Sequence, residues 1–152
     1  MNTSSNEKII LGIDPGSNVM GFGVIKIENT NIKLLQFGSL NFTKEKDHYV
    51  KLKKIYEGIT SIIEEFMPDE LAIEAPFYGK NIQSMLKLGR AQGVCITAAL
   101  EKDIPIFEYA PKRIKQSITG SGNATKEQVA DIFTQPLSQP LFEKFVPFIV
   151  RA

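Results

Sequence analysis

Three short segments rich in apolar and β-branched residues open the chain and predict three strands. They cover residues 8–14, 20–28 and 32–40, and the polar triplet NTN at residues 29–31 separates the last two. Turn residues between two such runs are typical of a hairpin. We therefore expect an antiparallel meander.

After the third strand, the spacing between apolar residues changes from two positions to three or four. Apolar positions recur at this spacing over residues 50–67, which predicts an amphipathic helix that ends before Pro68. A short apolar run at residues 71–74 predicts a fourth strand, which follows a helix and should therefore pair in parallel with the first strand. A long helix over residues 82–102 and a fifth strand over residues 104–108 complete the pattern.

The pattern weakens beyond the fifth strand. We expect a short helix over residues 111–117, a flexible loop at residues 120–123 and a helix over residues 126–133, which starts with capping-box spacing. The segment TQPLSQP at residues 134–140 breaks any helix.

Two glycines, Gly89 and Gly93, lie one turn apart in the long helix. Each costs about 1 kcal/mol relative to alanine in a helix interior, so the pair suggests close backbone approach to another element. Packing on the sheet and a dimer interface explain this equally well.

Two predicted strands end on an acid, Asp14 and Glu74. An acid at the end of a buried strand needs a cation, hydrogen bonds or water to stay charged. Carboxylate oxygens on rigid strands suit Mg²⁺ or Mn²⁺. Either acid alone could simply begin a turn, but the two together favour a divalent-metal site.

Size and composition fit one domain. The chain has 152 residues, of which 43% are apolar. It has no apolar stretch near the length of a membrane span, and residues 1–8 lack the apolar core of a signal peptide. We therefore expect a cytoplasmic protein without membrane partners.

Cysteine and histidine contribute little chemistry. One cysteine and one histidine rule out metal sites built from these residues. We expect Cys95 to be a packing residue and His48 to be a solvated surface residue.

Net charge is only +1, but residues 80–115 carry an excess of four positive charges that could form a basic face. The basic residues of this segment are Lys80, Lys87, Arg90, Lys102, Lys112, Arg113 and Lys115.

Several segments together resemble one family. They are LGIDPGS at 11–17, GFGVI at 21–25, AIEAPFYGKN at 72–81, LKLGRAQG at 86–93, FEYAPKRIKQ at 107–116 and GSGNATK at 120–126. The order of elements is ribonuclease H-like, and the segments closely resemble RuvC-type Holliday junction resolvases. The resemblance implies an α/β fold whose five-stranded mixed sheet, three antiparallel strands and then parallel strands, is flanked by helices.

The resemblance also implies an activity and partners. Such enzymes make paired symmetric nicks in four-way junction DNA during recombination and the repair of DNA damage, by phosphodiester hydrolysis that uses two Mg²⁺ ions, with Mn²⁺ as an alternative. Two equivalent nicks imply a homodimer, and proteins of a branch-migration complex are implied as partners.

Site residues carry over position by position. Asp14 and Glu74 match the first two metal-binding acids, with Asp14 bridging the ions. Phe77 matches an aromatic wedge near the junction crossover. Lys115 and Lys126 match basic residues that face the scissile strand, and we add Lys80 as a DNA-binding candidate.

The chain departs from the family after Phe133. The family has two further aspartates in a segment Asp-Ala-x-Asp-Ala-Leu-Ala on a closing helix, and we find no match to it. We therefore expect a resolvase domain at residues 1–133 and an atypical tail at residues 134–152 in place of that helix. With two acids instead of four, we expect impaired catalysis.

Other interpretations stay open at this point. A non-catalytic junction-binding relative would explain the two missing acids, and a structural remnant would explain the tail. An actin-like ATPase domain shares the Asp-x-Gly turn and the sheet order, but the chain is short for the two such domains required. The nuclease that matures ribosomal RNA shares the first strand, although residues 74–81 fit it poorly.

Overall fold

The structure, a computed structural model, describes residues 7–76, 79–113, 116 and 123. By its contacts the chain divides into two units, Met1–Glu108 and Tyr109–Ala152. The elements in chain order are β1 (Glu7–Asp14), β2 (Val19–Glu28), β3 (Asn31–Asn41), α1 (His48–Phe66), β4 (Glu70–Glu74), α2 (Ile82–Leu100) and β5 (Ile106–Tyr109). This is the predicted order.

The five strands form one mixed sheet with the order β3-β2-β1-β4-β5. The pairs β1/β2 and β2/β3 are antiparallel, whereas β1 and β4 are parallel. The crossover from the meander through α1 to β4 makes that parallel pairing possible. The predicted ribonuclease H-like architecture is therefore confirmed.

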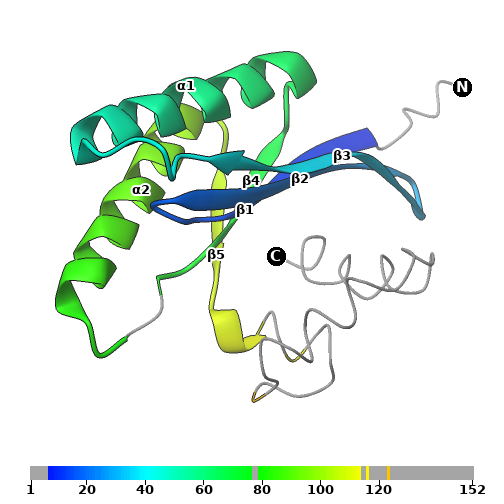
Figure 1. Cartoon of the computed structure of the whole chain (residues 1–152). Helices are drawn as coiled ribbons and strands as arrows, with labels where there is room; N and C mark the ends of the chain where they lie inside the picture. The colour runs from blue at the N-terminus through cyan, green and yellow to red at the C-terminus, as the bar shows by residue number, and fades with distance from the viewer. Residues whose placement is uncertain (1–6, 77–78, 114–115, 117–122, 124–152) are drawn as a thin grey trace, which may run out of the picture. The chain divides into compact units, whose positions relative to one another are not determined.

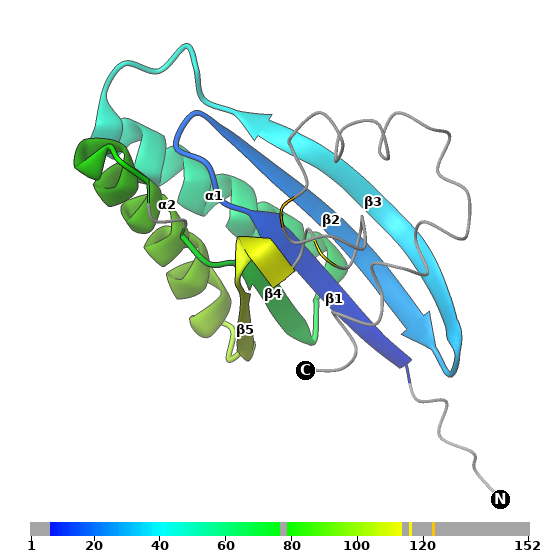
Figure 2. The same ribbon diagram turned by 90° about the horizontal axis from the view of Figure 1, so that it is seen from below.

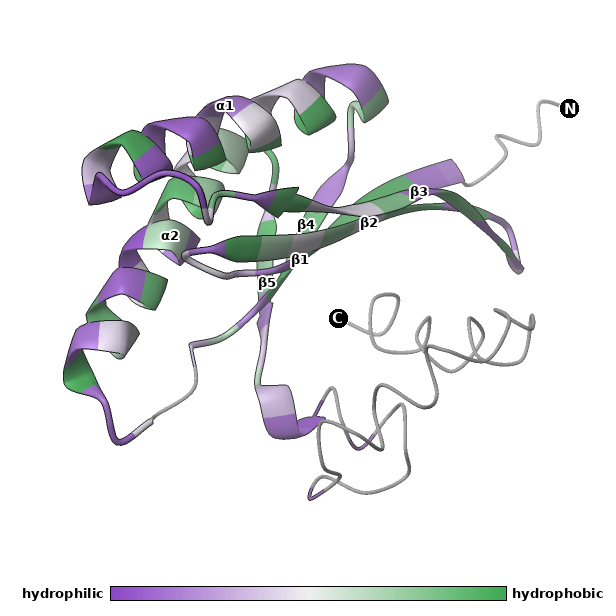
Figure 3. Ribbon diagram, viewed as in Figure 1, coloured by the Kyte–Doolittle hydropathy of each residue, from purple (hydrophilic) through white to green (hydrophobic). Residues whose placement is uncertain are grey.

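Both long helices pack on the same face of the sheet (Figures 1 and 2). Both helices present an apolar side to the strands, and the outer side of α1 is mainly polar, which is the amphipathic pattern of the sequence (Figure 3). The core between them includes Leu11, Ile13, Leu71 and Ile73 of the sheet, Ile55 and Ile59 of α1, and Ala91 and Cys95 of α2.

Local capping explains where α1 differs from its predicted start at residue 50. The Asp47 side chain accepts a hydrogen bond from the Val50 backbone N–H at 2.9 Å, so the helix begins at His48. It ends at Phe66 because Met67 adopts a left-handed conformation, with φ of 48°, directly before Pro68.

The end of α2 and the start of β5 also differ from the prediction. The Ile104 N–H donates to the Ala99 carbonyl, so Ile104 closes the helix end instead of opening the strand. Asp103 has a φ of 56°, which is incompatible with helix. The helix therefore ends at Leu100, and β5 begins at Ile106.

Cys95 is fully buried, as expected of a packing residue. Burial raises the pKa of its thiol to about 12. The expectation for His48 is wrong: its ring is half-buried, and Nε2 is buried without a hydrogen-bond partner among the described residues.

The described residues test only part of the later predictions. Residues 111–113 are helical, as expected. The helix at residues 126–133, nearly all of the loop at 120–123 and the tail at 134–152 lie outside the described residues, so the domain boundary after residue 133 stays a prediction. No helix in the described part of the chain is long and apolar enough to cross a membrane.

Candidate functional site

Asp14 is the last residue of β1, and its side chain is exposed. Its antiparallel partner on β2 is Gly21. A Cβ placed on Gly21 would lie 3.6 Å from the Asp14 Cβ. A side chain at position 21 would therefore lie in van der Waals contact with Asp14.

Glu74 is the last residue of β4 and is half-buried. In the parallel register of β1 and β4, Ile13 is paired with Ile73. Asp14 and Glu74 are the next residues of these strands, so they occupy equivalent positions on neighbouring strands. Residues at such positions point to the same face. The structure thus brings the two predicted acids together at one edge of the sheet.

This pair lies on the sheet face opposite the two helices. Ile13 and Ile73 contribute to the core beneath α1 and α2, and side chains alternate along a strand. The carboxylates therefore point away from that core. Over the described ranges, no group of three or more His, Cys, Asp or Glu side chains could hold a metal ion.

The turn after Asp14 is tightly packed against its own backbone. A Cβ on Gly16 would lie 1.8 Å from the Val19 carbonyl oxygen, far inside van der Waals contact. The segment between β1 and β2 can keep this path only with glycine at position 16. This turn determines where β1 ends and therefore where Asp14 lies.

Gln92 and Glu108 belong near the site, and sequence reasoning assigned neither a role. Gln92 lies on α2 and is buried. Its Nε2 lies 3.2 Å from the Glu74 carbonyl oxygen and 2.9 Å from Glu108 Oε1 on β5. The available signal was an uncharged polar residue on the apolar face of a helix.

The other predicted residues are placed less completely. Lys80 is exposed in the segment between β4 and α2. Phe77, Lys115 and Lys126 lie outside the described residues. The six described basic residues of the predicted basic segment are all exposed, and Lys102 pairs with Glu64 at 3.8 Å.

The surroundings of Gly89 and Gly93 show whether these glycines of α2 pack closely on the sheet. Apart from the backbone of its own helix, a Cβ on Gly89 or Gly93 would meet no atom of the described residues within 4 Å, so neither glycine serves close packing on the sheet. Ile82 and Leu86 precede them at helical spacing, and their exposed fractions are 72% and 55%. This apolar face of α2, formed by Ile82, Leu86, Gly89 and Gly93, lies on the side away from the core.

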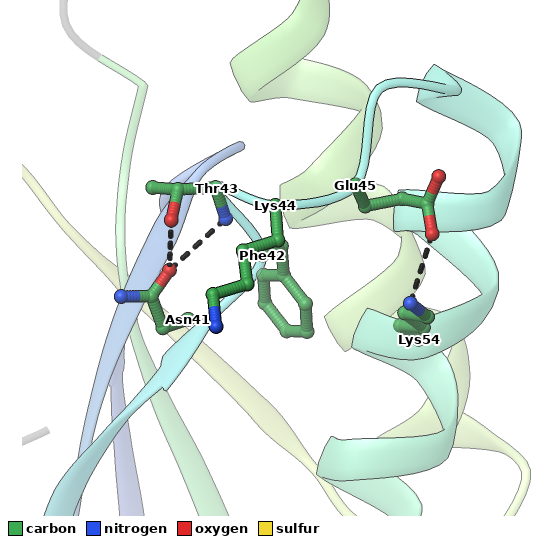
Figure 4. Close-up of a pocket in the computed structure, with 6 residues that line it drawn as sticks. All are labelled: Asn41, Phe42, Thr43, Lys44, Glu45 and Lys54. Atoms are coloured by element: carbon green, nitrogen blue, oxygen red, sulfur yellow. Dashed lines mark hydrogen bonds and ion pairs between the residues drawn. The ribbon is translucent and has the colours of Figure 1, made fainter.

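A pocket of about 350 Å³ lies between the end of β3 and α1 (Figure 4). Its charged and polar side chains largely pair with one another: Lys54 with Glu45 at 2.8 Å, and Asn41 with Thr43 at 2.7 Å. It contains none of the predicted site residues. The acid pair remains the better candidate site.

Comparisons of the sequence with known proteins identify one family. The family model described as crossover junction endodeoxyribonuclease RuvC matches residues 10–141. The protein of that name from Cytophaga hutchinsonii is 60% identical over 146 residues, which are 96% of this chain and 71% of the relative. The Porphyromonas gingivalis protein is 56% identical over 137 residues, which are 90% of this chain and 72% of the relative.

Solved structures agree with these sequences. The structure of Thermus thermophilus RuvC in complex with a Holliday junction substrate has a TM-score of 0.73 and 25% identity, and the match covers 91% of this chain and 88% of that chain. The fowlpox virus resolvase is 18% identical with a TM-score of 0.55, over 93% of this chain and 85% of that chain. At that identity the viral protein supports the fold alone.

Proposed function

Because the chain belongs to the RuvC family of crossover junction endodeoxyribonucleases, we propose that it hydrolyses phosphodiester bonds at four-way DNA junctions with metal held by Asp14 and Glu74. The family resemblance drawn from the sequence motifs is confirmed. The family consists of nucleases that depend on a divalent metal. These matches do not favour the ATPase, the ribosomal RNA nuclease or the non-catalytic relative.

The adjacency of the two acids carries the assignment of the site. Carboxylates from neighbouring strand ends supply hard oxygen ligands, which fit Mg²⁺. Magnesium needs only one or two protein carboxylates when water and substrate phosphate complete its octahedron. When bound, the metal supplies charge stabilisation at the phosphate and an activated water. Mn²⁺ fits the same ligands, and a second ion follows from the family resemblance.

The chain's own residues orient these ligands and the DNA. Asp14 and Glu74 hold negative charge on the face of the sheet opposite α1 and α2. We propose that Lys80 contacts a DNA phosphate, because it lies six residues after Glu74 in the sequence and its side chain is exposed. The roles of Phe77 as a wedge and of Lys115 and Lys126 at the scissile strand rest on the family resemblance.

Two symmetric nicks require two sites related by a two-fold axis. We propose that the apolar face of α2 forms the homodimer interface, because its large apolar side chains are exposed and its glycines have open space. The proposed setting is recombination and DNA repair in the cytoplasm, with branch-migration proteins as further partners.

A nicking assay tests the proposal. The full chain is incubated with a labelled synthetic four-way junction and Mg²⁺, and strand cleavage is compared between the wild type, Asp14→Asn and Asp103→Asn. The last variant is the matched control, since Asp103 is exposed and asparagine also tolerates its positive φ.

Because the sequence shows only two of the family's four acids, we expect slow but metal-dependent nicking by the wild type and the control, and a loss of at least about a hundredfold in Asp14→Asn. Equal nicking by all three proteins would refute the role of Asp14. Junction binding without any nicking by the wild type would instead favour the non-catalytic alternative, and would agree with the impaired catalysis expected from two acids.

A further inference from the structure

Gln92 is the one buried polar side chain in the described part of the core, with an exposed fraction of 5%. It projects from α2, so it reaches the sheet from the face opposite the two carboxylates. Its neighbours on the buried side of the helix are Ala91, Cys95 and Ala98. A polar side chain in such surroundings must satisfy its hydrogen bonds locally.

The hydrogen bonds of Gln92 join it to β4 at Glu74 and to β5 at Glu108. The two Nε2 protons are directed to the Glu74 carbonyl oxygen, at 3.2 Å, and to Glu108 Oε1, at 2.9 Å. The register of β1 with β4 stops one residue earlier, at Ile13 and Ile73. Gln92 therefore holds the backbone of β4 at the residue where the strand pairing ends.

The second hydrogen bond fixes Gln92 itself. Glu108 lies on β5, which neighbours β4 in the sheet. A carboxylate is a strong acceptor, and hydrogen bonds to it are stronger than neutral ones. Since one amide nitrogen serves both acceptors, the Glu108 bond restricts the rotamer that presents the other proton to Glu74.

We propose that Gln92 is a positioning residue that anchors the end of β4 and thereby orients the Glu74 carboxylate for metal binding. This inference rests on the proposed role of Glu74 as a metal ligand. Gln92 itself touches neither metal nor DNA. Outer hydrogen bonds of this kind typically change metal affinity by about 10- to 100-fold, and we expect the lower end because the bond reaches the backbone.

The experiment measures Mn²⁺ binding to the full chain by calorimetry, without DNA. Gln92→Met removes both protons at nearly constant volume, and Gln83→Met makes the same change at an exposed position of the same helix. Asp14→Asn defines the signal that belongs to the site. We expect Gln92→Met to weaken Mn²⁺ binding about tenfold and Gln83→Met to leave it unchanged.

A further variant separates positioning from stability. Gln92→Met also removes the partner of the Glu108 carboxylate, which should lower the melting temperature. In Gln92→Met/Glu108→Met both partners become apolar, so thermal stability should recover. Because the Glu74 carbonyl remains without its anchor, Mn²⁺ binding should stay about tenfold weaker.

Each outcome is decisive. Wild-type binding that is lost in Asp14→Asn and unchanged in Gln92→Met would overturn the inference while leaving the proposed function intact. Recovery of Mn²⁺ affinity in the double variant would also overturn it, because the effect would then arise from the unpaired Glu108. If the wild type shows no Mn²⁺ binding that depends on Asp14, the proposed metal site fails first.

Discussion

Replacing Gly89 and Gly93 together by alanine should stabilise the protomer and weaken the dimer. Within the described part of one chain, a Cβ at either position would meet no atom within 4 Å beyond the backbone of its own helix. The added methyl groups therefore cost nothing in packing, while each alanine improves helix propensity. The same methyl groups would lie between two copies of α2 if its apolar face is the dimer interface.

The two effects have opposite signs and similar sizes. Alanine is favoured over glycine by about 0.8–1.0 kcal/mol in a helix interior, so the double variant should gain about 2 kcal/mol. For a chain of this length that gain corresponds to a rise of about 4–8 °C in melting temperature. Overpacking an interface costs about 1–3 kcal/mol, which weakens dimerisation roughly 5- to 150-fold.

Two measurements separate these effects. Thermal unfolding at low protein concentration reports the protomer, and sedimentation over a concentration series reports the dimer. Gly58→Ala in α1 is the matched control. It gains the same helix propensity, but its Cβ would lie 2.8 Å from Leu40 Cδ1, so its net gain should be smaller.

A lower melting temperature for the double variant at low concentration would refute the conclusion that α2 has open space at both glycines. A higher melting temperature with unchanged dimerisation would refute the interface. A wild-type chain that remains monomeric at high concentration would also refute it.

Two further predictions concern the site turn and the buried thiol. Gly16→Ala should lower the free energy of unfolding by about 1–3 kcal/mol and slow nicking about a hundredfold, because the Val19 carbonyl must move and β1 then ends differently. Urea unfolding and the nicking assay measure these two effects. Gly79→Ala is the control, because a Cβ at that position has open space among the described residues. Wild-type behaviour of Gly16→Ala would contradict the tight turn. With its pKa near 12, Cys95 should be about one part in ten thousand thiolate at pH 8, compared with about a quarter for an ordinary thiol. Alkylation should therefore be very slow until urea unfolds the chain, and rapid labelling of the folded protein would contradict the burial.

The sequence was most informative where structure is coded locally. Residue spacing predicted both long helices, and short apolar runs predicted all five strands, because burial selects periods of 3.6 and two residues. The errors in the predicted elements were at their ends, where single hydrogen bonds decide. The Asp47 cap moved the start of α1, and the bond from Ile104 to Ala99 moved the start of β5.

By itself, the sequence determined that two strands end on acids and that the chain carries the motifs of a junction-resolving nuclease. Only the tertiary structure decided that Ile13 pairs with Ile73, which makes Asp14 and Glu74 neighbours. It also decided that Gly89 and Gly93 face away from the core and that Gln92 reaches Glu74 and Glu108. Strand register and helix rotation depend on packing between segments tens of residues apart, which no local pattern encodes.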